Sequence, residues 1–384
     1  MTKSLRVAMI GHGFMGAAHS VGWRQAPAAF ELPLAPTMAV LVGRDAERTT
    51  ADADRWGWSE TATDWRAVVE REDIDVIDIV TPGDSHAEIA IAALTAGKHV
   101  LCEKPLANTV ADAQRMADAA ASATGLSMVG FTYRRVPAVT LMRDLIAEGR
   151  IGAVRQVRAS YRQDWLADPE SPMTWRLEKD RAGSGSLGDI GAHAIDMTQF
   201  VTGQTVDRVS GVLETIVSER PLMGESVGLG GKAAAGVGTV TVDDLALFTG
   251  RLSSGALASF EATRFATGRK NALEIEISGD RGALYWNLED LNSLHHYDAT
   301  RPAGTQGFTR ILVTEPEHPY LSGWWPTGHM LGYEHGFSHQ VKDLVEAIAA
   351  RTAPEPSFSD GLRVQRVLDA VERSATDGSA WTDV

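Results

Sequence analysis

Cysteine is almost absent from this chain of 384 residues, which contains only Cys102. One cysteine cannot form an internal disulfide, so a fold held together by cystine crosslinks is excluded. Cys102 ends an apolar run, which predicts a buried structural thiol rather than a nucleophile. A chain without disulfides fits a reducing compartment, and we expect the protein in the cytoplasm.

Long apolar runs and an excess of positive charge are also missing. No stretch approaches the roughly 18–20 apolar residues of a membrane-spanning helix, and no secretory signal is visible. Lys and Arg number 36 against 50 Asp and Glu, a formal net charge of −14. Such a surface repels phosphates, so we expect neither a nucleic acid nor a membrane as partner. The length suggests about two globular domains.

What the chain does contain is a glycine-rich turn close to its start. Gly11, Gly13 and Gly16 follow a short apolar run and precede a helix-compatible segment. The first glycine permits a tight turn, the second lets the backbone approach a pyrophosphate, and the third lets helix and strand pack closely. The helix N-terminus then faces the anion. This turn, with Phe14 and Met15 inside it, predicts a dinucleotide site.

The first part of the chain, residues 1–130, alternates short apolar runs with amphipathic segments, which indicates an α/β Rossmann domain with a parallel sheet. We expect strands at residues 5–10, 37–43, 76–80, 99–102 and 127–130. We expect helices at residues 45–56, 85–96 and 109–121. The proline-containing segment 26–36 indicates a loop before the second strand.

Residues 131–384 show a different pattern, typical of an α+β domain with a large open, mostly antiparallel sheet. We expect strands at residues 154–161, 206–217, 245–252, 256–265, 272–278 and 283–288. We expect helices at residues 137–149, 186–202, 334–350 and 361–374. The Gly/Ala-rich segment 224–238 indicates a mobile loop, and His295-His296 a surface turn.

The end of the second expected strand bears on cofactor choice. An acid in this place bonds the adenosine ribose 2′-hydroxyl and repels a 2′-phosphate. The chain has Gly43 there, followed by Arg44, whose guanidinium fork suits a phosphate. The pair favours NADP over NAD. Two other interpretations stay open: Asp45 reaching the ribose, and Arg44 as a solvated surface cation.

Glu103 and Lys104 follow directly on the expected strand at 99–102. Ligands of open parallel sheets bind beyond the carboxyl ends of the strands, so we expect Lys104 to face the cofactor crevice. An ammonium there would hydrogen-bond a substrate hydroxyl and stabilise a developing alkoxide. Glu103 is expected to pair with Lys104 or to contact the cofactor. The alternative is a surface ion pair before a turn.

Asp189, His193 and Asp196 are spaced i, i+4 and i+7, so they share one face of the expected helix at 186–202. Histidine titrates near neutral pH and serves as a general base. A carboxylate one turn away orients it or holds another substrate hydroxyl. We predict catalytic roles for Asp189 and His193 and a supporting role for Asp196. The alternative is a satisfied core histidine.

Three further clusters carry groups that suit a polyol. Tyr133 and Arg134 lie at the expected domain junction, where a cleft would form. Gln163 ends an expected strand, and Trp175 with Arg176 offers a stacking face and a cation. Ordinary packing explains each cluster nearly as well.

His329, His335 and His339 are candidate metal ligands, and the last two are spaced i, i+4. They lack an H-E-x-x-H pattern and a matched acid, so a solvated helix face is favoured over zinc. No metal is expected.

Together these motifs resemble the Gfo/Idh/MocA family of oxidoreductases along nearly the whole chain. The resemblance rests on the glycine turn at 11–16, Thr81-Pro82 with His86, Glu103-Lys104-Pro105, Tyr133-Arg134-Arg135, Gly188-Asp189 with His193 and Asp196, and the segment 357–361. It implies a Rossmann domain followed by an α+β domain whose open sheet forms an oligomer interface, and hence a homo-oligomer, dimer or tetramer. It also implies that Thr81, Pro82 and His86 bind the cofactor.

By that resemblance Lys104, Asp189 and His193 match the catalytic lysine, aspartate and histidine of the family. The implied reaction is NAD(P)-dependent oxidation of a secondary alcohol on a small sugar or cyclitol. His193 would take the hydroxyl proton while hydride passes to nicotinamide. Lys104 would stabilise the alkoxide, and Asp189 would orient the substrate or His193.

The segments 163–165, 171–176 and 261–264 resemble the levoglucosan dehydrogenase branch, which implies an anhydrosugar or glycoside oxidised at C3. Inositol dehydrogenases share the catalytic trio, so a cyclitol stays open. Gly83 and Thr132 depart from the asparagines that many members carry. Two other functions remain: a dinucleotide-sensing regulatory protein without turnover, and a glycosidase that oxidises C3 transiently through held NAD.

Overall fold

The computed structural model describes residues 3–227 and 230–384, and the chain forms two compact units. Unit 1 comprises residues 1–132 and 332–365, and unit 2 comprises residues 133–331 and 366–384. Segment 332–365, which the sequence placed in the second domain, therefore returns to the first. The reason is a close helix pair: a Cβ at Gly22 would lie 2.8 Å from the carbonyl oxygen of Phe337.

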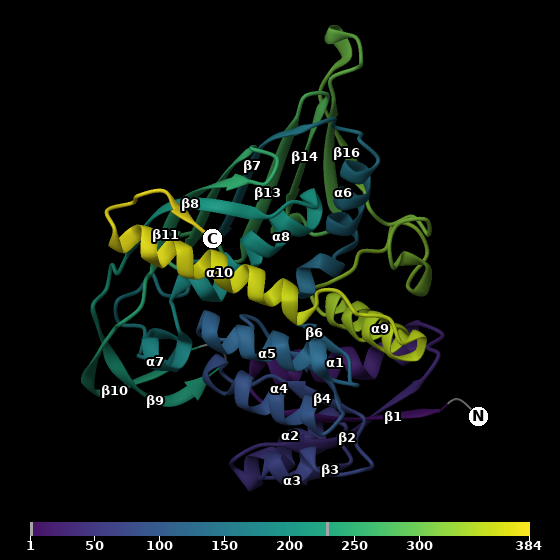
Figure 1. Ribbon diagram of the computed structural model, residues 1–384, viewed down its shortest axis with the longest axis vertical. Helices are drawn as coiled ribbons and strands as arrows, with labels where there is room; N and C mark the ends of the chain where they lie inside the picture. Colours follow the sequence, from purple (N-terminus) through teal and green to yellow (C-terminus); the bar gives the residue numbers. More distant parts are fainter. Residues whose placement is uncertain (1–2, 228–229) are drawn as a thin grey trace. The chain divides into compact units, whose positions relative to one another are not determined.

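Unit 1 is built on a six-stranded parallel sheet of order β3-β2-β1-β4-β5-β6 (Figure 1). Its strands are β1 (Ser4–Ile10), β2 (Ala35–Val42), β3 (Glu60–Ala62), β4 (Val76–Ile79), β5 (His99–Cys102) and β6 (Ser127–Val129). Five of them were expected, and the three-residue edge strand β3 was not. The order reverses between β1 and β4, so right-handed crossovers send successive helices to opposite faces and open a crevice at the carboxyl ends.

The helices of unit 1 follow the expected segments closely, except α3, which was not expected. They are α1 (Phe14–Ala29), α2 (Ala46–Trp56), α3 (Trp65–Val69), α4 (His86–Thr95), α5 (Val110–Ser122) and α9 (His335–Ala350), and α10 (Phe358–Thr376) begins in this unit. The loop expected at 26–36 was wrong in part, because α1 continues through Pro27 to Ala29. The solvated face expected for α9 was also wrong: His339 is fully buried and packs edge-on against Phe30.

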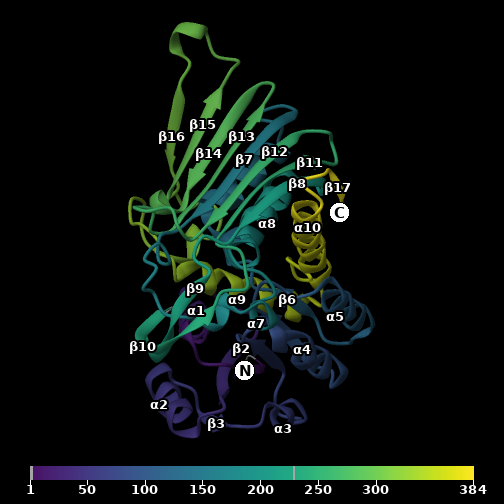
Figure 2. The ribbon, with the colours of Figure 1, turned by 90° about the vertical axis from the view of Figure 1, so that its left-hand side faces the viewer.

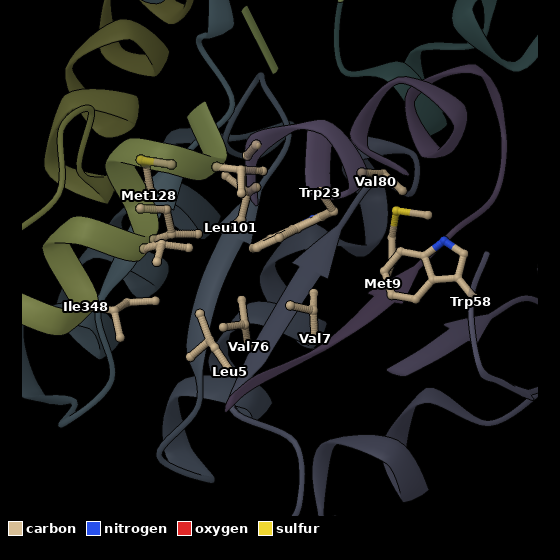
Figure 3. Packing of buried hydrophobic residues seen from close by; sticks show 14 of the residues in the cluster. Leu5, Val7, Met9, Trp23, Trp58, Val76, Val80, Leu101, Met128 and Ile348 are labelled. Carbon is tan, nitrogen blue, oxygen red and sulfur yellow. The ribbon is translucent and has the colours of Figure 1, made fainter. Parts of the chain in front are cut away.

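One apolar core joins the sheet of unit 1 to α1 and α9. Figure 3 shows side chains of β1, β4 and β5, among them Val7, Val76 and Leu101, gathered around Trp23. Ile348 brings α9 into the same cluster. The core therefore fixes the start of α1, and with it the glycine turn, onto the sheet.

Unit 2 contains a nine-stranded sheet of order β16-β15-β14-β13-β7-β12-β11-β8-β17, drawn as one continuous surface in Figure 2. Neighbours are antiparallel except β7 and β12, which run parallel. Its strands are β7 (Val154–Arg162), β8 (Val206–Glu214), β11 (Leu245–Leu252), β12 (Leu257–Thr263), β13 (Ala272–Gly279), β14 (Gly282–Asn287), β15 (Ser293–Asp298), β16 (Phe308–Leu312) and β17 (Thr382–Asp383). Helices α6 (Pro137–Ala147) and α8 (Ala192–Thr202) pack on it, and α7 (Lys179–Ala182) is a single turn.

Two expectations for unit 2 were wrong. The Gly/Ala-rich segment forms a separate antiparallel pair, β9 (Glu219–Val227) and β10 (Gly230–Thr239), in place of a loop. Residues 228 and 229 of that segment lie outside the described residues. His295-His296 lies in β15 rather than in a surface turn. In both cases pairing with a neighbouring strand decided the structure, and weak local propensity did not.

No helix in the described part of the chain is long and apolar enough to cross a bilayer. Within residues 3–227 and 230–384 there is also no group of three or more histidine, cysteine, aspartate or glutamate side chains placed to hold a metal ion.

Candidate active site

The glycine turn of unit 1 has the geometry that a bound diphosphate requires. Gly11 has φ +105°, and a Cβ there would lie 3.0 Å from the Val80 carbonyl. Gly13 is the N-cap of α1, receives no side-chain cap, and a Cβ built on it meets nothing within 4 Å. The first turn of α1 carries no acid. Uncapped amides at an open helix start form an anion site, so the turn fits a dinucleotide.

The third glycine of the turn serves packing. A Cβ at Gly16 would lie 3.1 Å from the carbonyl oxygen of Gly11 and 3.5 Å from Met9 and Trp56 side chains. Phe14 and Met15 open α1, with Phe14 47% exposed and Met15 packed against the core. Both lie at the helix start, where a dinucleotide would run.

Position 43 has no room for a side chain, because His12 and Thr49 lie against it. The sequence did not indicate this contact. A Cβ at position 43 would lie 2.3 Å from both the His12 ring and the Thr49 hydroxyl. His12 Nδ1 contacts Asp52 Oδ2 at 2.8 Å. The acid usual at this place is therefore replaced by a histidine from the glycine turn, which Asp52 holds.

The residues after Gly43 bear on the two interpretations that the sequence left open. Asp45 caps α2, and its Oδ1 accepts a hydrogen bond from the Arg48 amide at 3.1 Å. Arg44 is exposed, and its guanidinium makes no ion pair within the described residues. Asp45 is thus engaged by the helix, whereas the exposure of Arg44 agrees both with a solvated surface cation and with a ligand for an anion.

His86 supports the crevice rather than lining it. It is 1% exposed, its Nε2 lies 2.9 Å from the Thr81 carbonyl oxygen, and its Nδ1 lies 3.1 Å from that of Pro105. The ring thus ties the loop after β4, including Pro82, to the turn after β5. Its predicted contact with the cofactor has no support in this geometry.

The space beside Gly83 is filled from another segment. A Cβ at Gly83 would lie 2.4 Å from Asn108 Oδ1. Asn108 therefore brings an amide to the place where an asparagine at position 83 would have put one. The sequence carries this asparagine 25 positions later, where no local pattern marks it.

Glu103 and Lys104 begin the turn after β5, where Glu103 is buried and Lys104 is half-buried. Glu103 is 4% exposed; its Oε1 lies 3.0 Å from His19 Nε2, and its Oε2 accepts from the Lys104 amide at 3.3 Å. Gly130 leaves room for it, since a Cβ there would lie 2.3 Å from Oε1. Glu103 therefore points into unit 1, and the predicted cofactor contact of its carboxylate has no support in this geometry.

In unit 2, Asp189 and His193 lie on consecutive helical turns. Leu187–Gly191 forms a π-helical turn that continues into α8. Asp243 caps its start: the carboxylate accepts from the amides of Gly185 and Leu187 at 2.7 and 2.8 Å and from the Ser186 hydroxyl at 2.6 Å. Wide π turns are frequent at functional sites, and here one turn separates the two predicted catalytic side chains.

Asp189 is placed beside two arginines. Arg264 is fully buried, and its Nη1 lies 3.6 Å from Asp189 Oδ2. Its Nε and Nη1 have no hydrogen-bond partner among the described residues. Burial lowers the pKa of Arg176, and the charge of Asp189 opposes that shift. A carboxylate and two desolvated guanidinium groups form a strongly polar surface.

His193 lies against two tyrosines. Its ring centroid is 4.7 Å from that of Tyr133 and 5.9 Å from that of Tyr161. The Tyr133 and Tyr161 hydroxyls lie 2.8 Å apart, and Tyr161 donates to Asn271 Oδ1 at 2.7 Å. Gln163 Nε2 donates to the same oxygen at 2.7 Å. Predicted residues Tyr133, Gln163 and His193 thus share one network with two groups, Tyr161 and Asn271, that were not predicted.

Arg134 and Arg176, two of the predicted substrate residues, each contact another side chain of unit 2. Arg134 pairs with Asp196 through Nε–Oδ2 at 2.9 Å and Nη2–Oδ1 at 2.5 Å, and both side chains are buried. That pair gives Asp196 its expected supporting role and leaves a substrate role for Arg134 without support. The Arg176 guanidinium lies 4.4 Å from the ring centroid of Trp175.

Sequence reasoning missed Arg264, Asp243, Tyr161 and Asn271 as site residues. Arg264 was visible only as part of the segment 261–264, and Tyr161 only as the last residue of the expected strand at 154–161. Asp243 and Asn271 carried no local signal, because each acts on a segment more than 50 residues away in the chain.

A doubly wound parallel sheet with an uncapped glycine turn defines a dinucleotide-binding protein, and unit 2 adds an acid, a histidine and paired hydroxyls. Residues 5–131 match the oxidoreductase family with an NAD-binding Rossmann fold, and residues 139–285 match the GFO/IDH/MocA C-terminal domain. The chain therefore belongs to the Gfo/Idh/MocA family of oxidoreductases.

Several relatives extend over the whole chain. Levoglucosan dehydrogenase of Pseudarthrobacter phenanthrenivorans is 41% identical, covering 100% of this chain and 98% of its own. A levoglucosan dehydrogenase structure in complex with NADH and levoglucosan is 41% identical with a TM-score of 0.94, over 100% of both chains. An oxidoreductase domain protein from Kribbella flavida is 61% identical with a TM-score of 0.95, over 100% of this chain and 99% of its own.

Proposed function

We propose that the chain is an NAD(P)-dependent dehydrogenase that oxidises a secondary alcohol of a sugar, a levoglucosan-like anhydrosugar or glycoside, at C3. The observation that carries the proposal is the polar network of unit 2, in which His193 adjoins two tyrosine hydroxyls while Asp189 adjoins Arg264. Several oriented donors and acceptors beside a titratable base suit a ligand rich in hydroxyl groups. The whole-length likeness to levoglucosan dehydrogenase supports the substrate class.

Each residue of the predicted trio has a separate task. His193 accepts the proton of the reacting hydroxyl as general base. The Lys104 ammonium stabilises the negative charge that develops on the same oxygen. Asp189, held beside Arg264, accepts a hydrogen bond from a neighbouring hydroxyl and orients the sugar. A nicotinamide cofactor held at the turn of Gly11 and Gly13 would supply the acceptor for the hydride of the carbinol carbon.

For the cofactor, we propose that the site accepts NADP as well as the NAD of its relatives, with NADP favoured. The acid that would repel a 2′-phosphate is absent at Gly43, and the space is held by His12. Arg44 is exposed and has no internal ion pair among the described residues. A guanidinium there pairs with the extra phosphate.

The decisive assay follows reduced nicotinamide formation with levoglucosan, methyl glucosides and myo-inositol against both cofactors. Turnover of levoglucosan or a glycoside supports the proposal, and preference for myo-inositol favours the cyclitol alternative. Tight cofactor binding without turnover of any sugar would identify a dinucleotide sensor. Release of a free glycone with retained cofactor would identify the glycosidase chemistry.

We also propose a cytoplasmic homo-oligomer, dimer or tetramer, that uses the outward face of the unit 2 sheet. Val212 and Leu247 face each other on β8 and β11 and are 52% and 46% exposed. Leu257 on β12 is 45% exposed. Replacing Val212 and Leu247 by lysine is expected to give a monomer in light scattering, and an unchanged mass would rule out this face as the interface.

A further inference from the structure

A buried histidine that the proposed chemistry does not use lies inside unit 1. His19 is on α1, one turn beyond the glycine turn, and is 2% exposed. Its Nδ1 lies 2.9 and 3.0 Å from the two oxygens of Asp78 on β4, and its Nε2 lies 3.0 Å from Glu103 Oε1. Ionised carboxylates only accept hydrogen bonds, so a ring that contacts two of them through both nitrogens acts as a double donor.

The charges around His19 agree with that protonated form. Burial alone would lower the pKa of His19, but the charge and hydrogen bond of Asp78, with those of Glu103, outweigh it and raise the pKa to about 10. Trp23 supplies a further donor, from Nε1 to Asp78 Oδ2 at 2.7 Å. His19 and the two carboxylates thus hold one another in a buried site, where breaking one partner is costly.

The contacts of His19 join two parts of the proposed cofactor and catalytic machinery. Its helix begins at the glycine turn. Its partner Glu103 also accepts a hydrogen bond from the Lys104 amide through Oε2 at 3.3 Å. The lysine turn is therefore connected to the helix of the dinucleotide turn through a single imidazole ring and a single carboxylate.

We propose that His19 is a positioning residue: by bridging Asp78 and Glu103, it holds the turn that carries Lys104 in register with the helix that carries the dinucleotide turn. The inference rests on the role proposed for Lys104. Small misplacements of a catalytic group cost large factors in rate. The start of α1 is also held by the apolar core, through Trp23 and Met15. Loss of His19 should therefore affect turnover more than cofactor binding.

The test compares His19→Gln with Trp23→Phe in the full-length protein. Glutamine cannot hold both carboxylates in the same geometry. Phenylalanine removes the other donor to Asp78 and leaves the bridge to Glu103 in place. We expect His19→Gln to lower kcat by roughly 10-fold or more, with the Kd for NADH changed less than about 3-fold. Trp23→Phe should change kcat less than about 3-fold.

A second measurement reports on the surroundings of Lys104 and does not require that the protein turn over a substrate. The acylation rates of Lys104 and Lys98 are compared by peptide mass spectrometry. Lys98, at the other end of β5, donates to the carbonyls of Arg71 and Ile74 and is the internal control. We expect His19→Gln to change the rate at Lys104 several-fold and to leave Lys98 unchanged. If His19→Gln fails to fold, Glu103→Ala removes the same bridge from its other side, because alanine has no acceptor for His19 Nε2.

The outcomes separate this inference from the proposed function. A wild-type protein that turns over no sugar contradicts the function, and the Lys104 labelling still decides the bridge. Unchanged labelling at Lys104 in His19→Gln overturns the inference, whether or not sugars react. Equal losses of kcat in His19→Gln and Trp23→Phe also overturn it, because they would indicate a general loosening of α1.

Discussion

The two units build their polar sites in different ways. In unit 1 the relevant groups stand in the turns that directly follow β1, β2, β4 and β5, so each lies within a few residues of a strand end. In unit 2, Tyr133, Gln163 and Asn271 meet through one hydrogen-bonded network although more than 100 positions separate the first from the last. A parallel sheet concentrates function at one edge, whereas the large mixed sheet assembles it from distant segments.

The two units also differ in how their buried charged side chains are paired. Unit 1 places one cation, His19, between two carboxylates. Unit 2 buries arginines: Arg134 is matched by Asp196, whereas Arg264 keeps two donor atoms without a hydrogen-bond partner among the described residues. The charges of unit 1 hold elements together, and those near Asp189 are suited to a polar ligand.

The largest expected effect is on kcat, and it comes from a change in unit 1 that should leave cofactor binding intact. Lys104→Ala should lower kcat by roughly 10²-fold or more, because the developing alkoxide loses its charge partner. The Kd for NADH, measured by fluorescence titration, should be nearly unchanged. A near-normal kcat would remove Lys104 from the mechanism.

The next prediction concerns unit 2. It tests whether the segment of Asp189 depends on a carboxylate that is distant in the chain. Asp243→Ala removes the carboxylate that receives three hydrogen bonds at the start of the Asp189 segment. We expect a loss of about 2 kcal/mol or more in the free energy of unfolding, measured by denaturant titration. A loss below about 0.5 kcal/mol would show that the cap is dispensable.

The next prediction concerns the choice between NADP and NAD, which depends on residues of unit 1 alone. Arg44→Ala should raise the KM for NADP about 10-fold, the effect of one lost charge-assisted contact, and leave the KM for NAD unchanged. Glu47→Ala, in the first turn of the helix α2 that follows Arg44, is the control. Equal losses for both cofactors in Arg44→Ala would contradict the 2′-phosphate assignment.

The smallest effect concerns pH. The folded pKa of His19, about 10, exceeds the usual value of about 6.5, so its stabilisation is complete below about pH 6.5 and is lost as the pH rises towards 10. Burial also raises the pKa of Cys102, which adds to this trend at alkaline pH. The Tm of the wild type should fall more between about pH 7 and pH 9 than that of His19→Gln. Parallel Tm curves would contradict the assigned protonation of His19.

The contrast between the units explains what the sequence could predict. Turn chemistry and hydrophobic period are local, so the glycine turn at a helix start and the helical spacing of Asp189 and His193 could be predicted. The role of Lys104 stays a prediction. The return of α9 to unit 1 depends on a helix contact at Gly22, and the role of Asp243 depends on a loop that meets it only after folding. His12 beneath Gly43 and Asn108 beside Gly83 show the same limit at single positions, because the filling group comes from elsewhere in the chain.

The most direct test of the central claim is steady-state oxidation of levoglucosan by the purified full-length protein, with NAD and NADP compared and His193→Ala as the inactive reference. We predict reduced nicotinamide in proportion to sugar consumed, with a 3-keto sugar as product and turnover at least about 10²-fold above His193→Ala. Cofactor binding without oxidation of levoglucosan, any glycoside or any cyclitol would contradict it.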